Sequence, residues 1–192
     1  MTELEDRMNH RVRIANEADL LQLAEIHVAS WQDAFRGVVP DTILDGMSVA
    51  ASLKRWIKNF AAFPANIAVA VGKDGEIAGF CCAGPITDGD DWEQYPFRVF
   101  ALHIRPQKRG RGIGSALLDD ALDRAAHREG LNTAILWTLE ALVRTRRFYE
   151  REGGVLVKKG VWQIDGIALP EVAYAWQLPR ASAKGSRLPA GA

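Results

Sequence analysis

The chain has 192 residues, enough for one domain with a substantial core, and its 48% apolar and 25% charged residues are typical of a globular protein. Basic and acidic residues both number 24, so no overall positive charge would draw the protein to nucleic acid or to an anionic membrane. No apolar run approaches the roughly 20 residues that cross a bilayer, and the first ten residues lack the apolar region of a signal peptide. We therefore expect a cytoplasmic protein with no nucleic-acid or membrane partner.

The first predicted elements are a short strand and two helices. A strand over 12–15 is followed by Asn16, which resembles a capping box with Asp19 three residues later. The first helix should end near Gly37, and its apolar face is expected at Leu20, Leu23, Ala24, His27 and Trp31. A segment punctuated by proline and glycine then reads as a loop, after which Ser48 can cap the second helix.

The middle of the chain predicts antiparallel strands. Two apolar runs meet at Asp74-Gly75, a strong hairpin signal, and an acidic loop over 86–96 follows them. Cys81 and Cys82 are neighbours in the second run, where successive side chains point to opposite faces, so a disulfide between them would be strained. We expect reduced thiols, and because no Cys and His residues have the spacing of a metal site, we expect no metal.

The remaining pattern alternates strands and helices. A strand over 97–105, a helix over 115–129 and a strand over 133–138 form a β-α-β crossover, so the two strands should run parallel. A helix and two last strands are expected over 140–152, near 155–159 and near 171–178. The sequence therefore predicts an α/β (α+β) fold, with a mixed, mostly antiparallel sheet flanked by helices.

Three glycines alternate in a basic run between the first strand and the helix of this crossover. Alternate glycines at 110, 112 and 114 let the backbone approach a ligand closely, and a helix start offers N–H groups to an anion such as phosphate. The dinucleotide-binding motif lacks its third glycine in either register, and the P-loop motif lacks its Gly-Lys-Ser/Thr. The spacing that remains is Arg109-x-x-Gly112-x-Gly114.

This stretch resembles the pyrophosphate signature, (Q/R)-x-x-G-x-(G/A), of the GNAT superfamily of N-acetyltransferases. RRFYEREGG resembles a later helix of the family, and VRIANEADLLQLAEIHVASW resembles its opening strand and first helix. The resemblance implies an N-acetyltransferase domain over 11–178, between an extension over 1–10 and a disordered tail over 179–192. The implied reaction moves the acetyl group of acetyl-CoA to a primary amine of a small molecule or protein.

The resemblance also implies how acetyl-CoA is held. The pantetheine arm would pair with strand backbone, where the N–H of Ile104 would meet the acetyl carbonyl as an oxyanion donor. The loop backbone would cradle the pyrophosphate, close to the positive end of the helix dipole. The cofactor-binding residues expected on this basis are His103, Ile104, Arg105, Arg109, Gly110, Arg111, Gly112, Ile113, Gly114 and Ser115.

Acetyl transfer to an amine needs an acid and a base. Tyr149 matches the family's tyrosine acid, and a phenol with a pKa of about 10 stays protonated at pH 7. Where many members carry a glutamate base, this chain has Arg98. Three replacements are open: His103 on the same strand, Glu93 or Asp91 in the acidic loop, or loss of the amine proton to water without a dedicated group.

The acceptor pocket is implied to lie between the first two helices and the 86–96 loop. The acidic residues of that loop would attract a cationic amine, and aromatic side chains could surround it. The substrate-pocket residues expected on this basis are Trp31, Glu93 and Tyr95, with Trp92 beside them.

Two features favour a second reading, an acyl-CoA-binding sensor or regulatory module with little catalysis. One is Arg98, and the other is Leu142, where the family often has an asparagine that contacts pantetheine. The family often pairs through its C-terminal strands, and the apolar run 171–178 could serve as such an edge, so a homodimer is possible.

Overall fold

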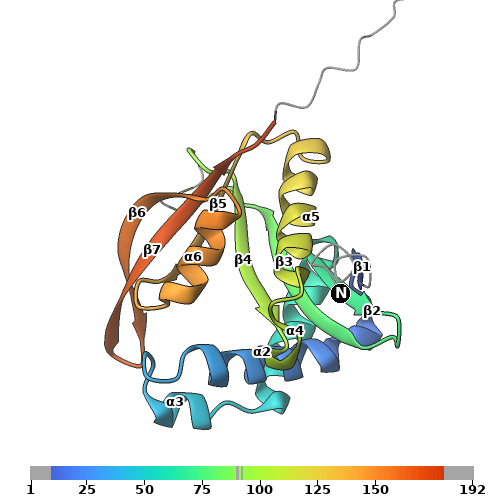
Figure 1. Ribbon diagram of the computed structural model, residues 1–192, viewed down its shortest axis with the longest axis vertical. Coiled ribbons are helices and arrows are strands. Elements are labelled where there is room, and N and C mark those ends of the chain that lie inside the picture. The colour runs from blue at the N-terminus through green and yellow to red at the C-terminus, as the bar shows by residue number, and fades with distance from the viewer. Residues whose placement is uncertain (1–9, 90, 92, 180–192) are drawn as a thin grey trace, which may run out of the picture.

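A seven-stranded sheet with the order β1-β2-β3-β4-β5-β7-β6 forms the centre of the protein (Figure 1). It is seen in a computed structural model, which describes residues 10–89, 91 and 93–179. The strands are β1 (His10–Ile14), β2 (Ile67–Gly72), β3 (Ile77–Pro85), β4 (Phe97–Ile104), β5 (Thr133–Leu139), β6 (Val155–Ile164) and β7 (Ile167–Gln177). Neighbouring strands are antiparallel except β4 and β5, which are parallel, so the predicted mixed sheet and β-α-β crossover are confirmed.

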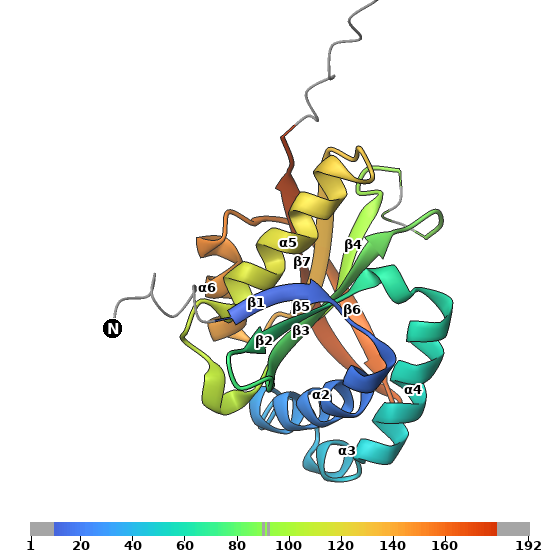
Figure 2. The ribbon, with the colours of Figure 1, turned by 90° about the vertical axis from the view of Figure 1, so that its right-hand side faces the viewer.

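Helices cover both faces of this sheet. They are α2 (Leu20–Ala34), α3 (Asp41–Asp45), α4 (Val49–Ala62), α5 (Ile113–His127) and α6 (Val143–Arg151), with 3-10 turns at Glu17–Asp19, Pro64–Asn66 and Pro106–Lys108. Figure 2 shows α5 and α6 on one side of the sheet and α2 and α4 on the other. One large apolar cluster lies beneath α5 and α6, and a second lies beneath α2 and α4. Among the described residues, no helix combines the length and apolar character needed to cross a membrane.

The N-terminal caps form as the sequence predicts, but a short helix was missed. Asn16 and Asp19 form the reciprocal capping box, and the Ser48 hydroxyl accepts a hydrogen bond from the backbone N–H of Ala51. The segment expected to be a loop contains α3, so three α-helices rather than two lie between β1 and β2. Leu44 of α3 is fully buried against side chains of β5 and of the start of α6, and this tertiary burial explains a helix too short to stand alone.

The order of the last two strands differs from the expectation. β6 and β7 are joined at Asp165-Gly166, where both residues have positive φ, as a tight hairpin turn requires. β7 lies between β5 and β6, so the run 171–178 is not an edge of the sheet, and that prediction is wrong. The edge strand on this side of the sheet is β6. The continuous burial of 172–176 has the pattern of a strand covered on both faces.

The parallel strands β4 and β5 separate soon after they meet. Their described register is limited to Arg98 with Ile135 and Val99 with Leu136. On its other side β4 has a bulge at Phe100, which is left over between two residues paired with β3 and is 52% exposed. A bulge bends its strand, and the part of β4 beyond this one leads to the glycine loop without pairing to β5.

The predicted extension over 1–10 and tail over 179–192 lie almost wholly outside the described residues, as do Asp90 and Trp92 of the acidic loop.

Candidate active site

The glycine loop presents backbone N–H groups at the start of α5. Gly110 and Gly112 have φ of 75° and 71°, in the left-handed region that other residues adopt only with strain. Gly112 is also the N-cap of α5, and within the described part of the chain no side chain caps this end of the helix. The first-turn N–H groups of α5 are therefore oriented for an anion, and the loop fits a pyrophosphate.

The third glycine of the loop brings two helices together. A Cβ atom on Gly114 would lie 3.2 Å from Cζ of Phe148, so a larger residue would push α6 away from α5. One residue later, the buried hydroxyl of Ser115 donates a 2.8 Å hydrogen bond to Glu152 at the end of α6. This bond, which the sequence analysis did not anticipate, fixes the loop relative to the helix that carries Tyr149.

Most of the basic side chains around the loop are already engaged with carboxylates. Arg109 forms an ion pair with Asp33 of α2. Lys108 Nζ lies 3.0 Å from Glu76, and Arg105 lies 3.4 Å from the same residue. Arg111 is exposed. Phosphate binding at this loop would therefore depend mainly on backbone N–H groups, with Arg111 the cation most open to solvent among these four.

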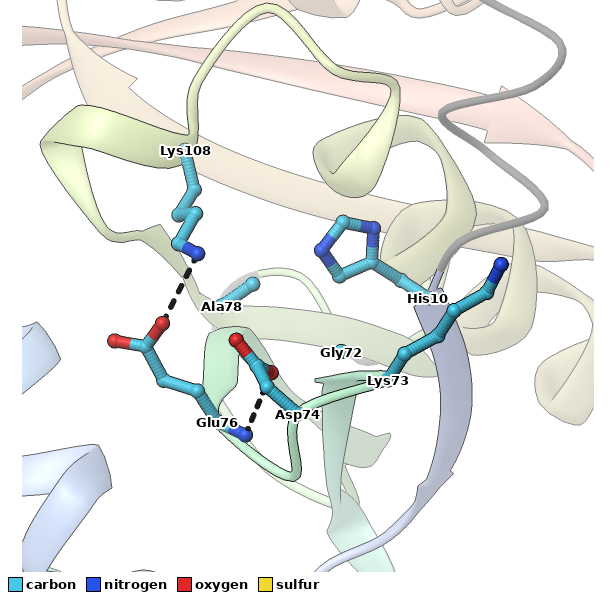
Figure 3. A pocket seen from close by; sticks show the side chains of 7 residues that line it. All are labelled: His10, Gly72, Lys73, Asp74, Glu76, Ala78 and Lys108. Carbon is cyan, nitrogen blue, oxygen red and sulfur yellow. Dashed lines mark hydrogen bonds and ion pairs between the residues drawn. The ribbon is translucent and has the colours of Figure 1, made fainter.

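A cavity of about 300 Å³ lies next to the loop, at the start of β1 and at the β2–β3 turn. Figure 3 shows the ion pair between Lys108 and Glu76 beside it, with Asp74 and Lys73 on the turn. Its lining carries both signs of charge and includes none of the predicted site residues. We therefore place the candidate active site elsewhere, along β4 and β5.

His103 and Ile104 follow the bulge in β4 and point to opposite faces of the sheet. Ile104 packs into the cluster beneath α5, whereas Nδ1 of His103 is hydrogen bonded to Ser30 of α2 at 2.7 Å. The His103 ring lies 5.2 Å from the ring of His27, whose Nδ1 is 3.0 Å from Ser52 of α4. Two histidines thus form a polar group beneath α2 and α4.

Both histidines are neutral at pH 7. Burial, with a contribution from Arg55, lowers the pKa of His27 to about 4. Burial, with contributions from His27 and Arg109, lowers the pKa of His103 to about 3. A neutral imidazole can accept a proton, but one with a pKa near 3 has little affinity for it.

This pair predicts a loss of stability in mild acid. The pKa of each histidine is lower in the folded protein than its unfolded value of about 6.5, so unfolding takes up protons below that pH. We expect the free energy of unfolding to be constant above pH 6.5 and then to fall by on the order of 1 kcal/mol per pH unit for each histidine. Urea titrations between pH 7.5 and 5 would measure this.

A variant of one of the two histidines tests this assignment. His103→Gln removes a ring that takes up a proton on unfolding, so it should reduce the pH slope. An unchanged slope in this variant would show that another group causes the acid sensitivity.

Tyr149 of α6 is 5% exposed and packs in the cluster shared with α5. Its ring contacts those of Phe148, Tyr174 and Trp176. Burial, with a contribution from Cys81, raises its pKa well above the ordinary value for tyrosine. Its hydroxyl is therefore protonated at any physiological pH and can act only as a proton donor until a proton is lost in the reaction.

The acidic loop is attached to the sheet through Asp91, whose carboxylate is engaged in two hydrogen bonds. Asp91 is 6% exposed, and its two oxygens accept 2.7 Å hydrogen bonds from Lys158 of β6 and Trp137 of β5. Burial alone would raise the pKa of Asp91, but these two donors outweigh it and keep the pKa below its usual value. Glu93, in contrast, is exposed.

The predicted aromatic residues of the acceptor pocket do not pack together. Trp31 lies in a cluster with Phe35 and Trp162, and its ring centroid is 5.8 Å from that of Trp162. Tyr95 belongs to a different cluster, and the Lys158 ammonium lies 5.7 Å from its ring. Trp162 was not predicted, although it lies on the same face of β6 as Lys158 by strand alternation.

Comparison with known proteins agrees with this architecture. Residues 23–154 match the acetyltransferase (GNAT) family. The uncharacterized N-acetyltransferase YuaI of Bacillus subtilis is 24% identical over 165 residues, covering 86% of this chain and 91% of that protein. The probable N-acetyltransferase Rv2775 of Mycobacterium tuberculosis is 25% identical over 174 residues, covering 86% and 92%.

Solved structures show the same fold. YncA of Salmonella typhimurium, a putative acetyltransferase solved with acetyl-CoA, superimposes with a TM-score of 0.65 at 17% identity, covering 93% of this chain and 99% of that one. The PaiA N-acetyltransferase of Thermoplasma acidophilum, solved with coenzyme A, gives 0.61 at 17% identity, covering 88% and 98%. The chain belongs to the acetyltransferase (GNAT) family and is an acyltransferase, as the sequence resemblance implied.

Proposed function

We propose that the protein is an acetyl-CoA-dependent N-acetyltransferase that moves the acetyl group to a primary amine of a small molecule or protein. The observation that carries this proposal is the separation of β4 from β5 after Val99, immediately before the strand leads into the glycine loop. Strand backbone that is not paired to β5 suits an extended amide-containing arm, and the loop beyond it suits a pyrophosphate. That YncA and PaiA were solved with acetyl-CoA and coenzyme A supports the same ligand here.

In this mechanism the chain positions the reacting groups mainly with backbone. When bound, acetyl-CoA supplies an acetyl group activated as a thioester. The N–H of Ile104, just past the bulge in β4, donates to the acetyl carbonyl oxygen and stabilises the negative charge that develops there. The N–H groups of the glycine loop and the first turn of α5 hold the phosphates.

Tyr149 acts as the acid in this proposal. Its phenol donates a proton to the sulfur as that atom leaves the acetyl carbon. The burial that raises its pKa keeps the proton on the oxygen, so the phenol is protonated when the C–S bond breaks. Ser115 and Glu152 support this role, because their hydrogen bond fixes α6 against the loop.

None of the three side chains considered as the base, His103, Asp91 and Glu93, has surroundings that suit a base. His103 lies on the strand beside Ile104, but its pKa of about 3 makes it a weak base. Asp91 is occupied by Lys158 and Trp137, and Glu93 is exposed. We therefore propose that His103 remains neutral and that its bond to Ser30 positions the end of β4.

One observation favours the alternative of an acyl-CoA-binding sensor with little catalysis. Leu142 is buried among apolar side chains, including Leu44 and Leu139, so this position offers pantetheine no polar side chain. The two readings agree on cofactor binding and differ only in turnover. The cytoplasmic location stays a prediction. The homodimer also stays a prediction, and it would have to form through a surface other than an edge at β7.

The first experiment is thermal unfolding with and without acetyl-CoA, with NAD and ATP as controls. A ligand at 100 times its Kd adds about 2.7 kcal/mol to the free energy of unfolding, which raises the Tm of a chain this size by about 5–10 °C. We expect this shift with acetyl-CoA and not with the controls. Thiol release from acetyl-CoA across a panel of primary amines then separates an enzyme from a sensor.

A further inference from the structure

The sheet face opposite α6 carries an indole ring that is held in one position. Trp137 of β5 pairs with Ala173 of β7, and its ring crosses the small alanine to reach β6. There, a Cβ atom on Gly160 would lie 3.0 Å from Cζ3 of the indole. The indole N–H donates to Asp91, so the ring is fixed at one end by a hydrogen bond and at the other by the glycine.

A carboxylate lies beside this ring. Glu171 of β7 pairs with Leu139 of β5 on one side and with Gly160 of β6 on the other. Oε1 of Glu171 would lie 3.3 Å from a Cβ atom on Gly160, so the carboxylate and the indole of Trp137 flank the same glycine. We call Trp137, Gly160 and Glu171 the Glu171 cradle.

A row of aromatic rings connects this face to β4. Trp162, two residues after Gly160 on β6, packs edge-on against Trp31 of α2 at 5.8 Å. The ring centroid of Trp31 lies 5.6 Å from that of His27. The ring centroid of His27 lies 5.2 Å from that of His103. The cradle therefore shares its face of the sheet with His103, whereas Tyr149 packs on the other face.

The charges around the cradle leave Glu171 as the carboxylate suited to a cation. The charge of Asp91 is neutralised by its ion pair with Lys158. The side chain of Glu171 is half-buried. Burial raises the pKa of Glu171, Arg98 of β4 lowers it, and Asp91 raises it. A half-buried carboxylate beside an indole is the chemistry that binds an ammonium group, through charge and through the ring's negative face.

We infer that Glu171 binds the protonated form of the acceptor amine and then takes a proton from it. The acceptor on this inference is a primary amine attached to an apolar or aromatic group. This inference rests on the proposed function. It places the base on β7, because Arg98 stands where many family members carry a glutamate on β4. It also places the apolar part of the acceptor against the side chains around Trp31 and Trp162.

The step balances as follows. The ammonium gives one proton to the Glu171 carboxylate, and the nitrogen lone pair forms the C–N bond to the acetyl carbon. The C–S bond breaks, its electron pair stays on sulfur, and sulfur takes the proton of Tyr149. The nitrogen loses its second proton to the Tyr149 oxygen, and Glu171 releases its proton to water. The products are an N-substituted acetamide and coenzyme A thiol.

The first test is binding of 2-phenylethylamine to the protein with coenzyme A present, followed by tryptophan fluorescence. We expect Glu171→Gln, which keeps the shape of the side chain, to weaken binding at least about tenfold, as loss of a charge-assisted contact implies. Glu140→Gln is the matched control, because Glu140 lies next to Leu139 but pairs with the exposed Lys159. Gly160→Ala, which crowds both the ring and the carboxylate, should also weaken binding and provides a second variant.

The second test is the pH profile of kcat/KM with the same amine. At pH 7 we expect Glu171→Gln to lower kcat/KM about 10- to 100-fold, within or below the range typical of a general base. The loss should shrink as the pH approaches the amine pKa of about 10, because water then removes the proton. The wild-type kcat/KM should stop rising with pH above the pKa of Glu171. The charged groups that act on Glu171 are Arg98 and Asp91, and Asp91 is itself paired with Lys158.

Equal binding by Glu171→Gln and wild type, or a loss that does not change with pH, would overturn the inference. So would a wild-type protein that is stabilised by acetyl-CoA but does not bind 2-phenylethylamine, a result that leaves the proposed function standing. Absence of the acetyl-CoA shift itself would instead count against the proposed function.

Discussion

Tyr149→Phe is expected to lower kcat for acetyl transfer about 100- to 1,000-fold while leaving the affinity for acetyl-CoA unchanged. The substitution removes only a hydroxyl from a side chain that is 5% exposed, so the packing against Phe148, Tyr174 and Trp176 is retained. The departing sulfur would then have to leave as a thiolate or take its proton from water. Steady-state thiol release and the acetyl-CoA-induced Tm shift would measure the two effects separately.

The adjacent tyrosine provides the control. Tyr174 donates a 2.6 Å hydrogen bond to Glu150 and accepts one from Arg146, and its ring centroid lies 5.9 Å from that of Tyr149. Tyr174→Phe should cost about 1 kcal/mol of stability with little change in kcat. Equal losses of kcat in the two variants would point to a structural effect of this aromatic cluster and would remove Tyr149 from the role of acid.

The second large effect is expected at the glycine loop, where Gly112→Val should abolish the 5–10 °C shift that acetyl-CoA is expected to produce, estimated at about 2.7 kcal/mol of binding. Gly112 has φ of 71° and caps α5, so a β-branched residue would move the N–H groups that we propose bind the phosphates. Thermal unfolding with and without acetyl-CoA measures the loss directly.

Gly130 near the other end of α5 is a matched control, because its φ of 67° imposes the same backbone strain away from the loop. Gly130→Val should lower stability by a similar amount, on the order of 1–2 kcal/mol, and keep the acetyl-CoA shift. If both variants lost the shift, general destabilisation would explain the result. If neither lost it, the loop would not be the phosphate site.

The sequence predicted the parts of this fold that depend on local chemistry. The reciprocal bonds of Asn16 and Asp19, the cap at Ser48 and the turn at Asp74-Gly75 each involve residues a few positions apart, so their residue types were sufficient. The glycine loop was recognisable for the same reason. Its conformation requires left-handed backbone at fixed positions, which leaves a visible spacing in the sequence.

The missed features all depend on contacts between segments that are far apart in the chain. Glu171 and Trp137 are neighbours only because β7 lies between β5 and β6, an order that the sequence did not reveal. The ion pairs of Arg109 with Asp33 and of Asp91 with Lys158 join segments far apart in the chain, so neither basic residue could be assigned a partner beforehand. Burial of Leu44 by distant elements likewise explains why α3 was expected to be a loop.

The short register between β4 and β5 has a mechanical consequence. With pairing limited to the start of the two strands, the sheet consists of two panels, β1–β4 and β5–β7, joined at one corner. The rest of the connection is made by side chains packed between α5, α6 and the strands, including the contact of Gly114 with Phe148. An extended ligand lying along β4 would act as a temporary strand between the panels, so the same backbone that recognises it would also complete the sheet.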